Sequence, residues 1–262
     1  MMPMVKTDNR SGVVWLTLSQ SQSRNPLSSE MLTALGDCLN DAYNNEAARV
    51  IVIAAEGPVF SAGHDLSEMA RRESENHDEW RARVLAILQL CAELMQGIVH
   101  APKPVIACVQ GTATAAGCQL VSACDLAIAA SDAKFCTPGV NMGAFCTTPL
   151  VGIGRNLSRK HALEMALTGE MFDAATAESF GLINRWVPSE SLLEETQALA
   201  DRIASRSAQA IAGGKSAFYR QIEMPLHDAF AYANEVMLDG MTSSDSKSGV
   251  KAFMEKREHK WN

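Results

Sequence analysis

The sequence predicts an α/β protein whose first half alternates strands and helices and whose second half is mostly helical. Short apolar runs, bounded by Gly, Pro or polar clusters, recur as far as residue 137. From about residue 147, apolar residues recur instead at helical spacing. No Gly/Ser-rich linker separates the two halves, and no repeat of fixed period is visible.

Six segments are predicted to be strands, and all but one lie in the first half. The run 49–57 is continuously apolar until Gly57-Pro58 ends it, which is typical of a strand buried on both faces. Segment 102–111 is bounded by two prolines and a glycine. The predicted strands are residues 12–19, 49–57, 102–111, 125–131, 133–137 and 182–187.

Helices are predicted where apolar residues recur every three or four positions. The first opens at Ser28-Ser29-Glu30, and residues 112–124 form a helix of small residues. Residues 59–67 are predicted to be a loop that enters another helix. The remaining predicted helices are residues 80–98, 159–167, 174–180, 189–206, 208–221, 226–241 and 245–258.

Composition narrows the class of protein. The chain has 262 residues, 47% of them hydrophobic and 20% charged, which is a globular balance. A net charge of −7 and only three tyrosines offer no basic, aromatic face for nucleic acid. No apolar run approaches the ~18–20 residues of a membrane span, and the N-terminal residues lack the features of a signal or transit peptide. These observations predict a cytoplasmic protein.

The seven cysteines are odd in number, and no pair has C-x-x-C spacing. Reduced thiols are therefore predicted, with neither a disulfide framework nor a metal site. Two motifs are incomplete. Segment 212–218 ends like a phosphate-binding loop, but Gln209 replaces the required glycine, and Leu157 replaces the third glycine of a dinucleotide loop after Gly152 and Gly154.

Two loops share a pattern that indicates a binding site. Residues 60–66 and 111–120 each follow a predicted strand, consist largely of small residues, and lead into a helix. The first turn of a helix has unpaired amides and a partial positive charge, and small residues let a ligand approach them. Two such amides aimed at one point form an oxyanion hole. The alternative is that the small residues only allow close packing of helix and sheet.

Together these loops resemble those of the crotonase superfamily, the enoyl-CoA hydratase/isomerase fold. The resemblance implies a spiral of ββα turns with an acyl-CoA cleft over residues 1–200. It also implies a helical region over residues 201–262 for oligomerisation, giving a homotrimer or homohexamer, and for closure over CoA. The segments that carry it are Ser23–Ser28, Arg49–Ala54, Phe60–Leu66, Lys103–Ala107, Gly111–Asp125, Phe135–Gly143, Leu167–Gly169, Ala177–Val187 and Phe253–Arg257.

The family implies an acyl-CoA or enoyl-CoA thioester as the ligand, with no cofactor beyond its CoA moiety and no metal. The oxyanion donors then fall on the backbone amides of His64 and Ala116. The residues that match CoA-binding positions are Arg24, Ala62, Gly63, Asp65, Leu66, Phe253 and Lys256.

The chain departs from the family at both catalytic glutamates. Gln119 and Gly139 stand at those positions, and neither can exchange a proton near neutral pH. The stretches AEGPVFSAGHDL, ATAAGCQLVSACD and TPGVNMGAFCTTP are similar to the enoyl-CoA hydratase domain-containing protein 3 group, which lacks both glutamates too. The departures therefore look like a subgroup trait.

Replacement groups are few, so three functions stay open. The His64 side chain, a thiolate of Cys118, Cys136 or Cys146, and a carboxylate of Glu68 or Glu73 are the candidates. The first function is an enoyl-CoA hydratase/isomerase-type enzyme of fatty acyl-CoA metabolism with replaced catalytic groups. The second is a non-catalytic acyl-CoA-binding or sequestering protein, and the third is a structural subunit that has lost CoA.

Overall fold

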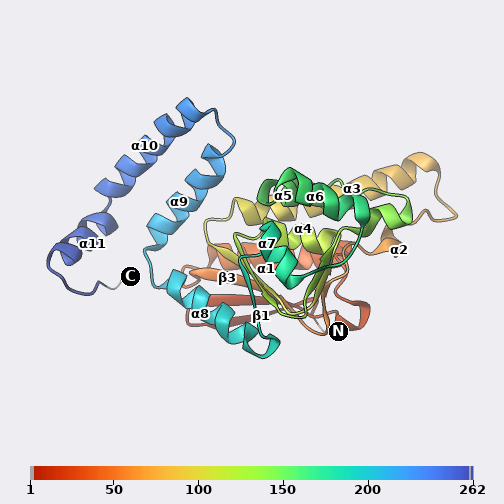
Figure 1. The fold of residues 1–262 in the computed structure, drawn as a ribbon, viewed down its shortest axis with the longest axis horizontal. Helices are drawn as coiled ribbons and strands as arrows, with labels where there is room; N and C mark the ends of the chain where they lie inside the picture. Colours follow the sequence, from red (N-terminus) through yellow and green to blue (C-terminus); the bar gives the residue numbers. More distant parts are fainter. Residues whose placement is uncertain (1–2, 260, 262) are drawn as a thin grey trace.

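Two β-sheets form the centre of the computed structural model, which describes residues 3–259 and 261 (Figure 1). The larger sheet has six strands in the order β1-β2-β3-β5-β7-β10, and the smaller has four in the order β4-β6-β8-β9. Neighbours pair parallel except β1 with β2 and β8 with β9. The strands are β1 Val5–Arg10, β2 Val13–Leu18, β3 Val50–Ala55, β4 Val59–Ser61, β5 Val105–Val109, β6 Thr112–Thr114, β7 Leu126–Ala130, β8 Lys134–Cys136, β9 Phe172–Asp173 and β10 Arg185–Val187.

The chain winds as a spiral in which each turn adds one strand to each sheet. The pairs β3–β4, β5–β6 and β7–β8 repeat this step, and helical segments follow each pair. This confirms the fold that the resemblance implied. The sequence shows no fixed period because α3 and its approach make the first of these turns far longer than the next.

Strand β3 of the larger sheet is buried on both faces, as the apolar run 49–57 predicted. Ile51 and Ile53 face the main core, which is formed with α1, α3 and α4. Val50 and Val52 face the opposite cluster under α8. There the fully buried Trp15 donates its indole N–H to Gln197 over 2.7 Å.

The helices surround these sheets and begin at recognisable caps. Ser28 caps α1 by accepting from the Met31 amide, which agrees with the predicted start. Asn76 and Glu79 form a capping box at the start of α3. The helices are α1 Ser29–Asn44, α2 Leu66–Met69, α3 His77–Val99, α4 Ala116–Ala123, α5 Pro149–Asn156, α6 Arg159–Thr168, α7 Ala174–Phe180, α8 Leu192–Ala204, α9 Ala208–Gln221, α10 Leu226–Thr242 and α11 Ser244–Met254.

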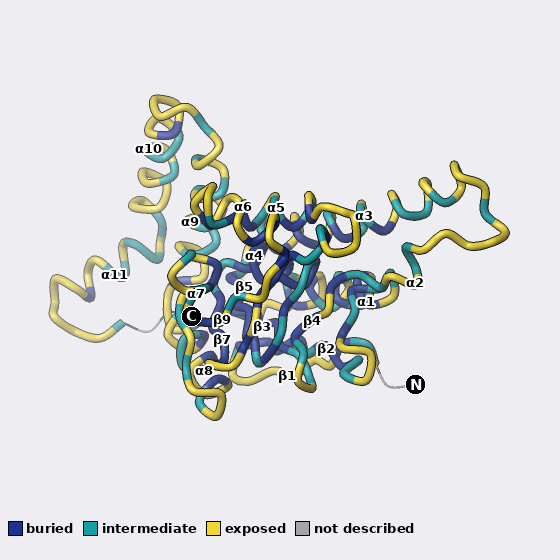
Figure 2. The backbone as a smooth tube through the Cα atoms, turned by 45° about the vertical axis from the view of Figure 1, so that its right-hand side comes forward, coloured by how far each residue is buried: buried dark blue, intermediate teal, exposed yellow. Residues whose placement is uncertain are grey.

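Helix α3 has the length and composition of a membrane-crossing helix, which the sequence had not been expected to contain. Its most apolar window has a mean hydropathy of 1.5. Cys91, Leu94 and Ile98 bury one side of its C-terminal half in the main core. The N-terminal half extends beyond the sheets and is largely exposed (Figure 2). Such a composition is also met in core helices of soluble proteins, so the feature is weak support for a membrane.

Helices α9 to α11 leave the body of the molecule as an arm, seen at the left of both views (Figures 1 and 2). Large apolar side chains of this arm are exposed, and Phe253 is 81% exposed. The predicted boundary between residues 200 and 201 falls within α8, which packs on the larger sheet. That boundary stays a prediction.

Candidate functional site

The two loops singled out in the sequence lie against each other. A Cβ atom added to Gly63 would lie 3.0 Å from the Thr114 carbonyl oxygen and 3.3 Å from the Ala116 amide nitrogen. Gly63 also has a φ of +86°, which favours glycine. The Thr114 hydroxyl donates to the Ala62 carbonyl over 2.9 Å and ties the loops together.

A second glycine brings helix α4 down onto strand β4. A Cβ atom on Gly117 would lie 2.5 Å from the Ser61 carbonyl oxygen, well inside contact distance. Because both approaches are between main chains, they hold the start of α4 beside the loop that carries His64. The small residues therefore allow close packing, as the alternative interpretation held, and that packing also brings the two loops together.

Ala115 turns the chain into α4 in an unusual conformation. Its φ of 49° and ψ of −116° are costly for a residue with a Cβ atom. Its amide donates to the Cys136 carbonyl over 2.9 Å, which fixes this turn to β8. No side chain of the described residues caps α4, so the helix offers the amide of Ala116 and a partial positive charge.

His64 is held as a neutral imidazole. Its Nδ1 lies 3.2 Å from the Leu27 carbonyl oxygen, which can only accept, so Nδ1 carries the proton. Burial lowers the pKa of His64, although the Leu27 contact and the charge of Glu68 oppose this. Nε2 is buried and has no hydrogen-bond partner within residues 3–259 and 261. The ring therefore offers one unpaired, basic nitrogen.

The predicted CoA-binding residues near the chain's beginning converge on the same loop. The Ala62 amide donates to the Arg24 carbonyl over 3.0 Å, and the Leu27 amide to the Gly63 carbonyl over 2.7 Å. Arg24 is exposed and has a φ of 68°. Asp65 caps α2 by accepting from the amide and hydroxyl of Ser67, and these hydrogen bonds lower its pKa.

Asn25 is a positioning residue that the sequence analysis did not single out. It is fully buried, and its side-chain amide donates to the carbonyls of Glu56 and Val59 over 2.9 and 2.8 Å. Its φ of 49° is of the kind that asparagine tolerates better than most residues. The Asn-Pro step after a polar run was the available signal.

The two positions of the missing carboxylates differ in their surroundings. Gln119 on α4 is 6% exposed, and its Oε1 is buried without a hydrogen-bond partner in the described chain. A Cβ atom on Gly139 would lie 2.9 Å from the Cys146 sulfur. The Gly139 amide donates to that sulfur over 3.3 Å. The thiol thus fills the space that a side chain at position 139 would enter.

The replacement groups proposed from the sequence are constrained. Burial raises the pKa of Cys118 and Cys146, and raises that of Cys136 to about 11, so the three thiols stay protonated at neutral pH. Glu68 Oε2 accepts from the amide and hydroxyl of Ser29, both over 2.8 Å, so it is occupied at the start of α1. Glu73 lies exposed between α2 and α3.

Two predicted site residues do not join the others. Phe253 and Lys256 are exposed on and just after α11, at the far end of the arm from α2 (Figure 1). In the described part of the chain, no group of three or more His, Cys, Asp or Glu side chains could hold a metal ion.

A ββα spiral that brings two main-chain loops together at a helix start defines the crotonase-fold class of proteins. The family model described as enoyl-CoA hydratase/isomerase matches residues 8–262, and the chain belongs to that family. The chain is 44% identical over 260 residues to enoyl-CoA hydratase domain-containing protein 3, mitochondrial, from Rattus norvegicus, covering 98% of this chain and 84% of the relative.

Solved structures agree with this assignment. An enoyl-CoA hydratase from Mycobacterium smegmatis has a TM-score of 0.92 at 43% identity and covers 99% of both chains. Human enoyl Coenzyme A hydratase domain-containing protein 3 has a TM-score of 0.92 at 41% identity, over 98% of this chain and 100% of its own. The resemblance noted from the sequence is confirmed, down to this group.

The predicted cytoplasmic location is wrong by the same comparison. The curated relatives from Rattus norvegicus, Mus musculus, Homo sapiens and Xenopus laevis are all named mitochondrial. The prediction depended on the composition of the N-terminal residues, which carries less weight than four concordant relatives.

Proposed function

We propose that the chain binds an acyl-CoA or enoyl-CoA thioester where the two loops meet. The observation that supports this proposal is how closely the two loops approach each other. A Cβ atom added to Gly63 would lie 3.3 Å from the Ala116 amide nitrogen. The amides of His64 and Ala116 form an oxyanion hole that polarises the thioester carbonyl and stabilises an enolate. One such donor contributes about 3–4 kcal/mol.

The CoA portion lies along Arg24 and residues 62–66. Arg24 is exposed and joined through its carbonyl to Ala62, which supports a contact with the nucleotide phosphates. Phe253 and Lys256 close over the nucleotide from a neighbouring copy, because within one chain they lie far from the loop. This requires a homotrimer or homohexamer, and a monomeric mass by light scattering at micromolar concentration would contradict it.

Ordinary hydration is weak in this site. Gln119 and Gly139 replace both glutamates, and general acid–base groups contribute ~10²–10⁴-fold each. We expect crotonyl-CoA hydration to be slower than that of a two-glutamate enzyme by at least ~10⁴-fold. A rate close to that of a competent hydratase would overturn this and direct attention to the His64 imidazole, whose Nε2 is unpaired.

Non-catalytic acyl-CoA binding or sequestration is the second candidate function. It is favoured by the Cys146 sulfur, which fills the space beside Gly139 where a catalytic side chain would enter. A turnover screen over enoyl-CoAs, paired with calorimetry on the same thioesters, separates the candidates. Binding with turnover supports the enzyme, binding alone supports the binder, and no binding at any chain length refutes both.

A further inference from the structure

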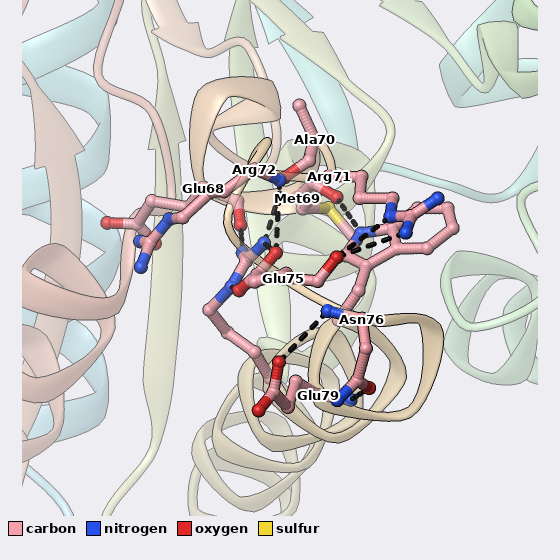
Figure 3. A network of polar contacts seen from close by, with 10 residues as sticks. Glu68, Met69, Ala70, Arg71, Arg72, Glu75, Asn76 and Glu79 are labelled. Carbon is pink, nitrogen blue, oxygen red and sulfur yellow. Dashed lines mark hydrogen bonds and ion pairs between the residues drawn. The ribbon is translucent and has the colours of Figure 1, made fainter.

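Helix α2 directly follows the His64 loop, and its C-terminal end is capped by side chains of α3. The carbonyl oxygens of Glu68, Met69 and Ala70 end this single turn. Arg83 donates to the Glu68 carbonyl and, over 2.8 Å, to the Ala70 carbonyl. The Trp80 indole N–H donates to the Met69 carbonyl over 2.8 Å. Figure 3 shows this network of contacts from close by, with Glu68, Met69, Ala70 and Glu75 among the labelled residues.

Glu75 holds Arg83 in that position. Its carboxylate accepts from Nε and Nη2 of Arg83 over 2.6 and 2.7 Å, in the two-pronged geometry that suits a guanidinium. The side chains of Glu75 and Arg83 are only 13% and 19% exposed. Hydrogen bonding to Arg83 and to the Arg72 amide lowers the pKa of Glu75 to about 2, so the pair stays charged at neutral pH.

The opposite side of α2 is fixed just as firmly. The Glu68 carboxylate binds the amide and hydroxyl of Ser29 at the start of α1, where the helix carries a partial positive charge. An isolated turn of four residues is not stable by itself in water. The conformation of α2 therefore depends on these contacts to α1 and α3.

We infer that Glu75, Arg83 and Trp80, hereafter the α2 clamp, are positioning residues that fix α2 and through it the His64–Leu66 part of the acyl-CoA site. The inference rests on the proposed function only for the identity of the ligand. Asp65 caps α2 and Leu66 is its first residue, so a shift of α2 displaces both. Loss of the clamp should therefore weaken thioester binding without unfolding the core.

Arginine is required in this clamp because it serves three acceptors at once. The planar guanidinium offers five donors in a fixed fork, whereas a lysine ammonium is a point charge on a flexible stem. Arg83→Lys keeps the charge and should restore little of the function. Arg81→Met on the same helix is the matched control, because Arg81 is exposed and has no place in the clamp.

The experiment measures hydrogen exchange of residues 64–70 and the calorimetric Kd for crotonyl-CoA. The full-length wild-type protein is compared with Arg83→Met, Arg83→Lys, Glu75→Gln and Arg81→Met. We expect Arg83→Met to speed exchange of residues 64–70 by at least about tenfold and to raise Kd by at least about tenfold. The global denaturant midpoint should change little, which distinguishes positioning from a general loss of stability.

Three results would overturn the inference. Unchanged exchange in Arg83→Met would show that the clamp does not order α2. Faster exchange with unchanged Kd would show that α2 does not position the site, and a full rescue by lysine would remove the role of the guanidinium fork. If the wild-type protein binds no thioester, the proposed function fails, while exchange at residues 64–66 still decides whether the clamp orders the loop.

Discussion

At the scale of single residues, Gly139 and Cys146 form a matched pair. The sulfur lies where a Cβ atom on residue 139 would come within 2.9 Å, so the Cys146 side chain must shift before a carboxylate can enter there. A smaller residue at position 146 should therefore make a glutamate at position 139 easier to accommodate.

The first prediction tests this pair by a double-mutant cycle. Gly139→Glu alone should lower the free energy of unfolding by ~1–3 kcal/mol, as overpacking does. Combined with Cys146→Ala, its cost should shrink by at least ~0.5 kcal/mol, because neighbours couple. Gly154→Glu, which meets open space, is the control. Strict additivity in urea unfolding would contradict the coupling.

Adding Gln119→Glu to the double variant should then raise the rate of crotonyl-CoA hydration.

The second prediction concerns His64 and pH. Folding lowers the pKa of His64 from its ordinary value of about 6.5. Just below pH 6.5, the unfolded chain therefore binds a proton at His64 more readily than the folded chain does. The free energy of unfolding should therefore fall as pH drops below about 6.5, and His64 should leave it unchanged above that pH. Urea unfolding at several pH values checks this. His64→Gln should flatten the profile, whereas His227→Gln, at a 94% exposed side chain, should not. Equal slopes in both variants would refute it.

At the scale of elements, the turn into α4 stores strain at Ala115. The third prediction is that Ala115→Gly raises the free energy of unfolding by ~1 kcal/mol. Relief of ~1–3 kcal/mol of backbone strain should exceed the cost of the greater conformational entropy that glycine gives the unfolded chain. Ala113→Gly in the neighbouring strand, which is not at positive φ, should do the opposite. Thermal unfolding of both variants provides the measurement, and a destabilised Ala115→Gly would show that the turn is unstrained.

The elements that the sequence predicted are those with long apolar patterns. Strand β3, helix α1 and most helices of the second half agree with their predicted segments within a few residues. Strand β1 was missed because it is an edge strand with five of its six residues exposed, so no alternation is visible. Strands β4 and β6 have three residues each, too few for a period, and β6 was absorbed into the predicted helix 112–124.

The candidate site was predictable as far as local pattern reaches. Small residues at two strand-to-helix junctions predicted two loops of a binding site, and these loops do contact each other. The contact of Cys146 with Gly139 and of Glu75 with Arg83 depends on how the chain folds between them, and nothing in their spacing reveals it. Asn25 had a weak signal in its Asn-Pro step. Phe253 and Lys256 were assigned to the site only because of the family resemblance, and within one chain α11 lies far from the two loops.

At the scale of the whole molecule, Lys215 anchors the arm to the body. Its ammonium contacts Asp125 over 2.7 Å and the carbonyls of Ile98 and Lys103, and it is 8% exposed. Asp125 also accepts from Tyr219 and from the Val105 amide at the start of β5. Residues 212–218, which resemble the end of a phosphate-binding loop, thus lie in helix α9 and anchor it to the body through Lys215.

The fourth prediction is that Lys215→Met lowers the free energy of unfolding by ~3–5 kcal/mol, because it leaves Asp125 buried without its cation. Lys160→Met, at an exposed site on α6, should change it little. Limited proteolysis should then cut the arm of the Lys215 variant first. A variant as stable and as protease-resistant as the wild type would show that the arm is held elsewhere.

The contacts of Gly63 and Gly117 with the facing main chain have a consequence for how such a protein can change over generations. Main-chain carbonyl oxygens are the nearest atoms that face both glycines, and Gln119, Gly139 and Cys146 are not among the atoms that these glycines meet. Under the proposed function, substitutions at Gln119, Gly139 or Cys146 could therefore exchange one chemistry for another while the thioester carbonyl binds at the same point. The spiral fold would then allow the reaction to change without rebuilding the place where the carbonyl binds.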